Sequence, residues 1–141
     1  MATGEVREGA LDDHNAEFPM IASSWLGRQN RYSYHQTIPL EYPATFHGIT
    51  KYDLSDASTV SYDYSAGVYG SESPFCPVEN PKSEDDGYLV SFVTDTHDWS
   101  SSCHVFRADA LADGPICTVH LPHRVPAGFH ATWVPGASLT A

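Results

Sequence analysis

The residue best suited to chemistry in this chain is His130, within residues 123–135, which read HRVPAGFHATWVP. A histidine held rigidly in a largely apolar setting is suited to binding a metal through its neutral imidazole. Phe129 and Trp133 lie on either side of His130 in the sequence and would supply such a setting. The same pattern also fits a core histidine hydrogen-bonded to a backbone carbonyl. From these residues alone the core histidine is favoured, and the metal ligand stays open.

The residues around His130 predict an irregular segment that becomes a strand. Pro122 and Pro126 each lack a backbone N–H and fix φ, so no helix runs through this stretch. Gly128 gives the backbone freedom just before His130. Residues 132–134 are Thr, Trp and Val, which favour an extended conformation. We therefore expect His130 where a turn becomes a strand.

The rest of the chain is typical of an all-β protein. Short runs of β-branched and aromatic residues alternate with turn formers, and no helical stripe occurs beyond one short turn at 108–112. The best-defined strand is 88–94, which follows an Asp-Gly turn signal, and we expect it to form an antiparallel hairpin with 102–107. The other expected strands are 31–38, 46–54, 58–64, 116–121 and 131–135, with a proline-interrupted edge strand at 71–78. This pattern fits a sandwich, a barrel or a propeller.

Composition excludes several classes of protein. A length of 141 residues predicts one domain, and 18 acidic against 7 basic residues argue against binding to nucleic acid or to an anionic membrane. Cys76, Cys103 and Cys117 form no CxxC pair, which argues against a disulfide framework or a zinc ribbon. The first 18 residues have no apolar core, and no apolar run is long enough to span a membrane. We expect reduced thiols and a cytoplasmic protein.

Six motifs follow one another along the chain, and together they resemble the carotenoid cleavage oxygenase family. That family includes carotenoid, apocarotenoid and lignostilbene dioxygenases and the retinal pigment epithelium isomerase. The motifs are EFP at 17–19 with GRxxRYxY at 27–34, KYDL at 51–54, GSExPFxP at 70–77, EDDGYL at 84–89, GP and LP within 114–122, and FHATW at 129–133. Two departures are Met20, where the family has arginine, and the order Arg107-Ala108-Asp109 in place of D-A-R.

The resemblance implies a fold and a cofactor. The family folds as a seven-bladed β-propeller with Fe(II) on its axis, held by four histidines, and the last of these matches His130. The chain resembles only the last two to three blades, so we expect a loop at 1–16, propeller strands within 17–135 and a tail at 136–141. Glutamates that accept hydrogen bonds from the ligand imidazoles match Glu17 and Glu72, which implies that both orient the iron ligands without touching the iron.

The other three iron histidines of the family have no counterpart in this chain. A pair formed by His120 and His123 would point to opposite faces of a strand. We expect a surface or structural role for the seven histidines other than His130: His14, His35, His47, His97, His104, His120 and His123.

The implied reaction is oxidative cleavage of a conjugated C=C bond of a carotenoid, apocarotenoid or stilbene by O₂, giving two carbonyl products. No organic cofactor is required. Phe75, Phe129 and Trp133 either line a channel for the apolar substrate or pack in the core. Because three ligands and the N-terminal blades are missing, we expect this chain alone to be inactive, with any peripheral membrane contact made only through the missing parts. The alternative is a non-catalytic all-β fragment with a binding or structural role.

Overall fold

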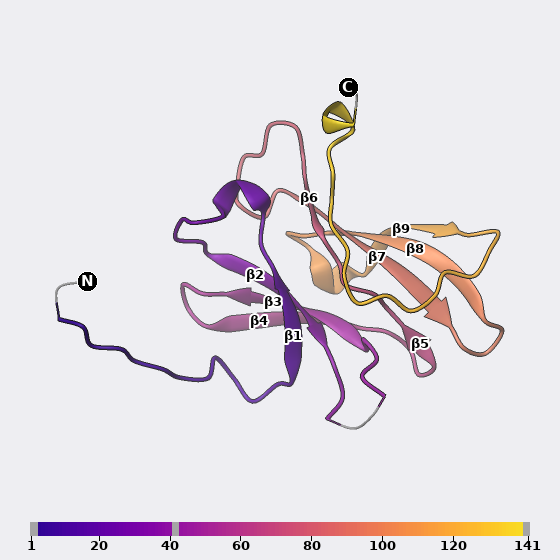
Figure 1. Cartoon of the computed structure of the whole chain (residues 1–141), viewed down its shortest axis with the longest axis horizontal. Coiled ribbons are helices and arrows are strands. Elements are labelled where there is room, and N and C mark those ends of the chain that lie inside the picture. The colour runs from indigo at the N-terminus through magenta and orange to yellow at the C-terminus, as the bar shows by residue number, and fades with distance from the viewer. Residues whose placement is uncertain (1–2, 41–42, 140–141) are drawn as a thin grey trace.

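The chain folds into two antiparallel β-sheets, as the computed structural model of residues 3–40 and 43–139 shows (Figure 1). The first sheet has four strands in sequence order: β1 (Ala16–Met20), β2 (Tyr32–Thr37), β3 (Gly48–Asp53) and β4 (Ser58–Asp63). Each strand pairs with the next, and β3 and β4 are joined by a short turn at residues 54–57. The expected strands at 31–38, 46–54 and 58–64 are thereby confirmed.

The second sheet is built around a long central hairpin. Strands β7 (Gly87–Asp95) and β8 (Ser100–Arg107) pair antiparallel from Tyr88↔Arg107 to Asp95↔Ser100, which confirms the expected hairpin. On one side β9 (Pro115–His120) pairs with β8. On the other side the short strands β5 (Val68–Tyr69) and β6 (Phe75–Pro77) both pair with β7.

Three short 3₁₀ turns complete the structure, and they lie at Ser23–Trp25, Leu111–Asp113 and Gly136–Ser138. The second overlaps the short turn expected at 108–112. Ala16 belongs to β1 rather than to the expected N-terminal loop, and β5 was not expected. The last two residues of the expected tail, 140 and 141, and residues 1 and 2 of the expected loop lie outside the described part of the chain.

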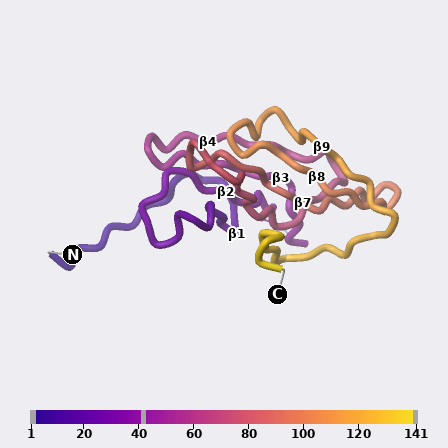
Figure 2. Tube along the Cα trace, turned by 90° about the horizontal axis from the view of Figure 1, so that it is seen from above, coloured from indigo at the N-terminus to yellow at the C-terminus, as the bar shows by residue number. Residues whose placement is uncertain are grey.

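The expected strand at 131–135 is wrong. Within the described residues the chain after β9 forms no further strand, and it returns along one side of the two sheets toward β1 (Figure 2). We call residues 121–135 the C-terminal strap. The Val125 N–H donates to Ser101 Oγ at 3.0 Å, and the Ala131 N–H donates to a side chain as well. Leu121 at the start of the strap donates its N–H to the Ser101 carbonyl of β8, and side-chain acceptors hold the strap at Val125 and Ala131.

The two sheets share one apolar core. Tyr34 and Ile49 from the first sheet are buried together with Leu89, Val93 and Phe106 from the second. The Tyr34 and Phe75 rings lie 5.6 Å apart across the contact. This shared core fixes the position of β2 relative to β6.

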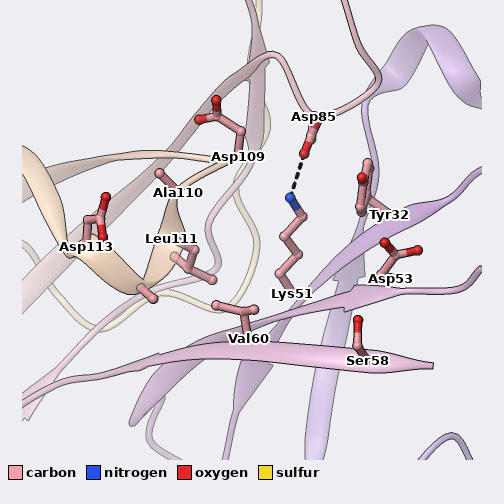
Figure 3. Close-up of a pocket in the computed structure, with 11 residues that line it drawn as sticks. Tyr32, Lys51, Asp53, Ser58, Val60, Asp85, Asp109, Ala110, Leu111 and Asp113 are labelled. Atoms are coloured by element: carbon pink, nitrogen blue, oxygen red, sulfur yellow. Dashed lines mark hydrogen bonds and ion pairs between the residues drawn. The ribbon is translucent and has the colours of Figure 1, made fainter. Parts of the chain in front are cut away.

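A buried ion pair also joins the sheets, at one end of a cavity of about 420 Å³ (Figure 3). Lys51 on β3 extends toward Asp85 in the loop before β7, and Nζ lies 2.7 Å from the carboxylate. The Lys51 ammonium also lies 4.1 Å from the centre of the Tyr32 ring. Burial alone would raise the pKa of Asp85, but hydrogen bonds from Lys51 and Ser83 outweigh it, so this pKa lies below its usual value.

Replacing Lys51 should destabilise the fold in a pH-dependent way. Lys51→Met leaves Asp85 charged and unpaired, which should cost about 3 kcal/mol at pH 7. The wild type loses the stabilising contribution of Asp85 as the pH falls through its lowered pKa. Without Lys51, burial raises the pKa of Asp85 instead, so the cost shrinks as acid neutralises the carboxyl.

Urea unfolding at pH 7 and near pH 4 measures this difference, with Lys82→Met as the control because Lys82 is exposed. An equal cost of Lys51→Met at the two pH values would contradict the role given to the ion pair.

Candidate metal-binding site

Glu72 is the centre of the candidate site. It follows Ser71 in the segment between β5 and β6, and only 7% of its surface is exposed. Its Oε2 accepts a hydrogen bond from the backbone N–H of Ala131 at 2.5 Å. A charge-assisted bond of this length between residues 59 positions apart fixes the strap at the residue after His130.

The same carboxylate lies beside the His130 ring. Nδ1 of His130 is 3.5 Å from Oε2 of Glu72. A carboxylate at Nδ1 favours the tautomer that carries its proton there, which leaves the lone pair of Nε2 free. The His130 side chain is 83% exposed. It is therefore not the core histidine of the alternative interpretation, and residues 3–40 and 43–139 do not form the expected rigid apolar enclosure around it.

Aromatic rings cover one side of His130. The Phe18 ring lies 5.4 Å from the imidazole in an edge-on arrangement, and it contacts Phe46 at 5.1 Å and Phe129 at 6.0 Å. Phe18 has a φ of 56°, a conformation that is uncommon for a bulky residue. The strand register shifts between Glu17 and Met20, so a bulge in β1 turns Phe18 toward the strap.

Glu17 lies on β1 opposite Gln36 of β2. Residues paired across two strands share a face, so Glu17 is on the face that Gln36 presents toward the Ser71–Ser73 segment. The Glu17 side chain is exposed. The structure thus brings the Glu72 carboxylate to the His130 ring. Glu17 is exposed on β1, and among the described residues it makes no contact with His130.

The remaining histidines are spread over the surface. His14 pairs with Asp12, and His97 pairs with Asp95. His35 and His104 are half-buried, whereas His47, His120 and His123 are exposed. Within residues 3–40 and 43–139, no three His, Cys, Asp or Glu side chains come together as a metal site.

The residues that are present fit one ligand position of a metal site. Nδ1 of His130 faces the buried Glu72 carboxylate, so Nε2 is left as the metal-binding atom, as is usual for a metal-bound histidine. The open side of His130 leaves room for further ligands. A single histidine gives no tight affinity, which comes from several ligands fixed together.

Of the aromatic residues expected to line a channel, two come together. Phe75 and Trp133 line a cavity of about 250 Å³ with Pro19, Met20 and Pro74. Phe129 instead contacts Phe18 and Phe46 in the ring cluster beside His130. Apolar surface therefore lies on both sides of the strap.

An all-β chain with an imidazole–carboxylate pair suited to metal binding is thus the class that the fold and the site define. The family model described as retinal pigment epithelial membrane protein matches residues 1–135, and the chain belongs to this family. The membership confirms the resemblance to the carotenoid cleavage oxygenases.

Curated relatives are carotenoid-cleaving enzymes. Carotenoid 9,10(9',10')-cleavage dioxygenase 1 of Pisum sativum is 36% identical over 149 residues, and that of Arabidopsis thaliana is 38% identical over 147 residues. Each alignment covers 95% of this chain but 27% of the relative. A 9-cis-epoxycarotenoid dioxygenase of Oryza sativa is 34% identical, with 99% of this chain and 23% of the relative covered. The chain therefore spans about a quarter of the length of these relatives.

Solved structures show the same fold. Lignostilbene dioxygenase of Pseudomonas brassicacearum superposes with a TM-score of 0.80 at 23% identity, over 89% of this chain and 28% of that one. A variant of the Synechocystis apocarotenoid oxygenase gives a TM-score of 0.85 at 23% identity, over 94% and 28%. The cobalt-substituted form of that oxygenase gives 0.79 at 23% identity, over 88% and 26%. Separately, no helix in the described part of this chain is long and apolar enough to span a membrane.

Proposed function

We propose that this chain is the C-terminal part of a non-haem Fe(II) dioxygenase that cleaves a conjugated C=C bond of a carotenoid, apocarotenoid or stilbene. The observation that carries the proposal is Glu72, which binds the Ala131 N–H and lies beside Nδ1 of His130. This arrangement supplies one oriented imidazole, in a family whose curated members cleave carotenoids.

The two sheets are proposed as two successive blades of a β-propeller. Each is an antiparallel sheet of mostly short strands, and the fold is shared with much longer oxygenase chains. The remaining blades, with the other three histidines, would come from parts of the protein outside this chain. Residues 16–120 then supply the strands, and the strap carries His130 to the propeller axis.

His130 is proposed to bind Fe(II) through Nε2, while Glu72 keeps the proton on Nδ1 and holds the ring in place. Glu17 is proposed to do the same for an imidazole contributed from outside this chain. Phe18 shields one side of the ligand ring from water. A metal as the bound ion is supported by the cobalt-substituted form of the Synechocystis apocarotenoid oxygenase, which shares this fold.

The chemistry that Fe(II) supplies when bound is the reaction of O₂ with the alkene. One molecule of O₂ and one C=C bond give two C=O groups, so both oxygen atoms enter the products and no external reductant is consumed. The substrate class implied by the relatives is an apolar polyene or stilbene. The cavity beside Phe75 and Trp133 is the proposed apolar surface along which the polyene or stilbene substrate binds.

The complete enzyme, meaning a protein of the relatives' length that contains this chain, should convert an apocarotenoid or a stilbene into two carbonyl products. Mass spectrometry of the products formed under ¹⁸O₂, taken before their carbonyl oxygens exchange with water, should show one labelled oxygen in each of the two carbonyl products. The 141-residue chain assayed in parallel should bind no stoichiometric Fe(II) and release no product, because it contributes a single imidazole. A complete enzyme that binds these substrates but never cleaves them would support the non-catalytic alternative.

A further inference from the structure

A buried polar network surrounds the backbone on both sides of Glu72. Its members are fully or almost fully buried, and they are Gln36, Ser71, Ser73 and Ser91. Buried polar groups are costly unless hydrogen-bonded. The apolar core maintains the fold without these four residues, and the pair formed by Glu72 and His130 does not include them. Their burial therefore needs another explanation.

Gln36 makes two bonds that fix the backbone on both sides of Glu72. With the amide oriented to satisfy both partners, its nitrogen donates to the Ser71 carbonyl at 2.9 Å and its oxygen accepts from the Ser73 N–H at 3.3 Å. A primary amide carries its N–H donors and its carbonyl acceptor on two separate atoms, so one side chain can make both bonds at once. The residue between these two bonds is Glu72, whose side chain points to the strap.

Ser91 of β7 holds the same segment from the second sheet. Its Oγ accepts from the Ser71 N–H at 3.1 Å, and Ser71 Oγ accepts from the Phe92 N–H at 3.0 Å. The backbone around Glu72 is therefore held between β2 and β7. Sub-ångström placement of a ligand-orienting carboxylate requires a rigid backbone of this kind.

Gln36 is also the cross-strand partner of Glu17. The fully buried Gln36 thus lies on the strand next to Glu17 and binds the backbone on both sides of Glu72, the two glutamates proposed to orient iron ligands.

We propose that Gln36 is a positioning residue for the metal site, setting the position of Glu72 and through it the orientation of His130. The expected effect of Gln36 on catalysis rests on the proposed function. The effect of Gln36 on the position of Glu72 concerns this chain alone, so the structural effect and the catalytic effect can be tested separately. Gln36 touches neither substrate nor metal and acts through Glu72.

The structural part is read from the Ala131 amide proton in the NMR spectrum of the 141-residue chain. A short bond to a carboxylate moves an amide proton downfield, so Gln36→Leu should move this resonance upfield as Glu72 shifts. Gln29→Leu is the matched control, because Gln29 is exposed. Gln36→Met, which keeps the length of the side chain but neither of its two hydrogen bonds, is the second variant if the leucine variant does not fold, and the same shift is expected.

The catalytic part is read from the complete enzyme loaded with Fe(II). Gln36→Leu should lower kcat per bound iron about tenfold and leave KM unchanged. Ile49→Val, which loosens the core at the residue paired with Gln36, should leave kcat per iron unchanged.

An unmoved Ala131 resonance in the Gln36 variants, or an equal loss of kcat per iron in Ile49→Val, overturns the proposal. A complete enzyme without cleavage activity overturns the proposed function instead, and the Ala131 resonance still decides the role of Gln36.

Discussion

His130→Ala in the complete enzyme should remove the bound iron and reduce double-bond cleavage below detection. His130 is the one imidazole of this chain whose Nδ1 lies beside a buried carboxylate, within the described residues. The neighbouring Phe129 offers no replacement donor. Because the lost group is itself a ligand, the loss of iron affinity should exceed the roughly 100-fold that removal of an orienting partner costs.

His123→Ala is the matched control. His123 lies seven residues earlier in the same strap, and it is exposed. Iron content measured by plasma mass spectrometry and product formation should both stay near the wild-type values in this variant. Equal iron loss from the two variants would refute the assignment of His130.

Glu72→Ala should lower iron affinity roughly 10- to 100-fold, the usual cost of removing a carboxylate that orients a metal-bound histidine. Two contacts disappear together: the acceptor for the Ala131 N–H and the carboxylate at Nδ1 of His130. The strap then loses its fixed position at the ligand. Glu72→Gln keeps an oxygen for the Ala131 N–H, so its loss of affinity should be smaller.

Titration of the metal-free complete enzyme with Fe(II) under anaerobic conditions measures these affinities. Glu79→Gln is the control, because Glu79 is an exposed glutamate seven residues further along the chain. Glu17→Gln should also weaken iron binding if Glu17 orients an imidazole from outside this chain. Unchanged affinity in Glu72→Ala would show that the contact with the strap has no part in metal binding.

The strands were predictable because their signals are local. Alternating residues in two neighbouring runs define the β7–β8 hairpin within 21 residues, so sequence pattern and structure agree there. The strand expected at 131–135 failed for the opposite reason. Extended propensity forms a strand only beside a free edge, and the Ala131 N–H is instead taken by the Glu72 carboxylate, which lies 59 positions earlier.

The site was only partly predictable for the same physical reason. Motif resemblance pointed to His130, Glu17 and Glu72 as candidate site residues, but burial of Gln36 depends on partners 35 and 37 positions away, at Ser71 and Ser73. Alternation along residues 31–36 places Gln36 on the same face as Tyr34, which was the one available signal. Nothing in the sequence indicated the positive φ of Phe18, since glycine is the residue that normally marks such a conformation.

Whether His130 binds iron with its ring oriented by Glu72 can be seen by anomalous diffraction at the iron edge from crystals of the complete enzyme. We expect an anomalous peak at bonding distance from Nε2 of His130, with Nδ1 directed at the Glu72 carboxylate. A peak bound through Nδ1, or an iron peak with His130 outside its coordination sphere, would contradict this expectation.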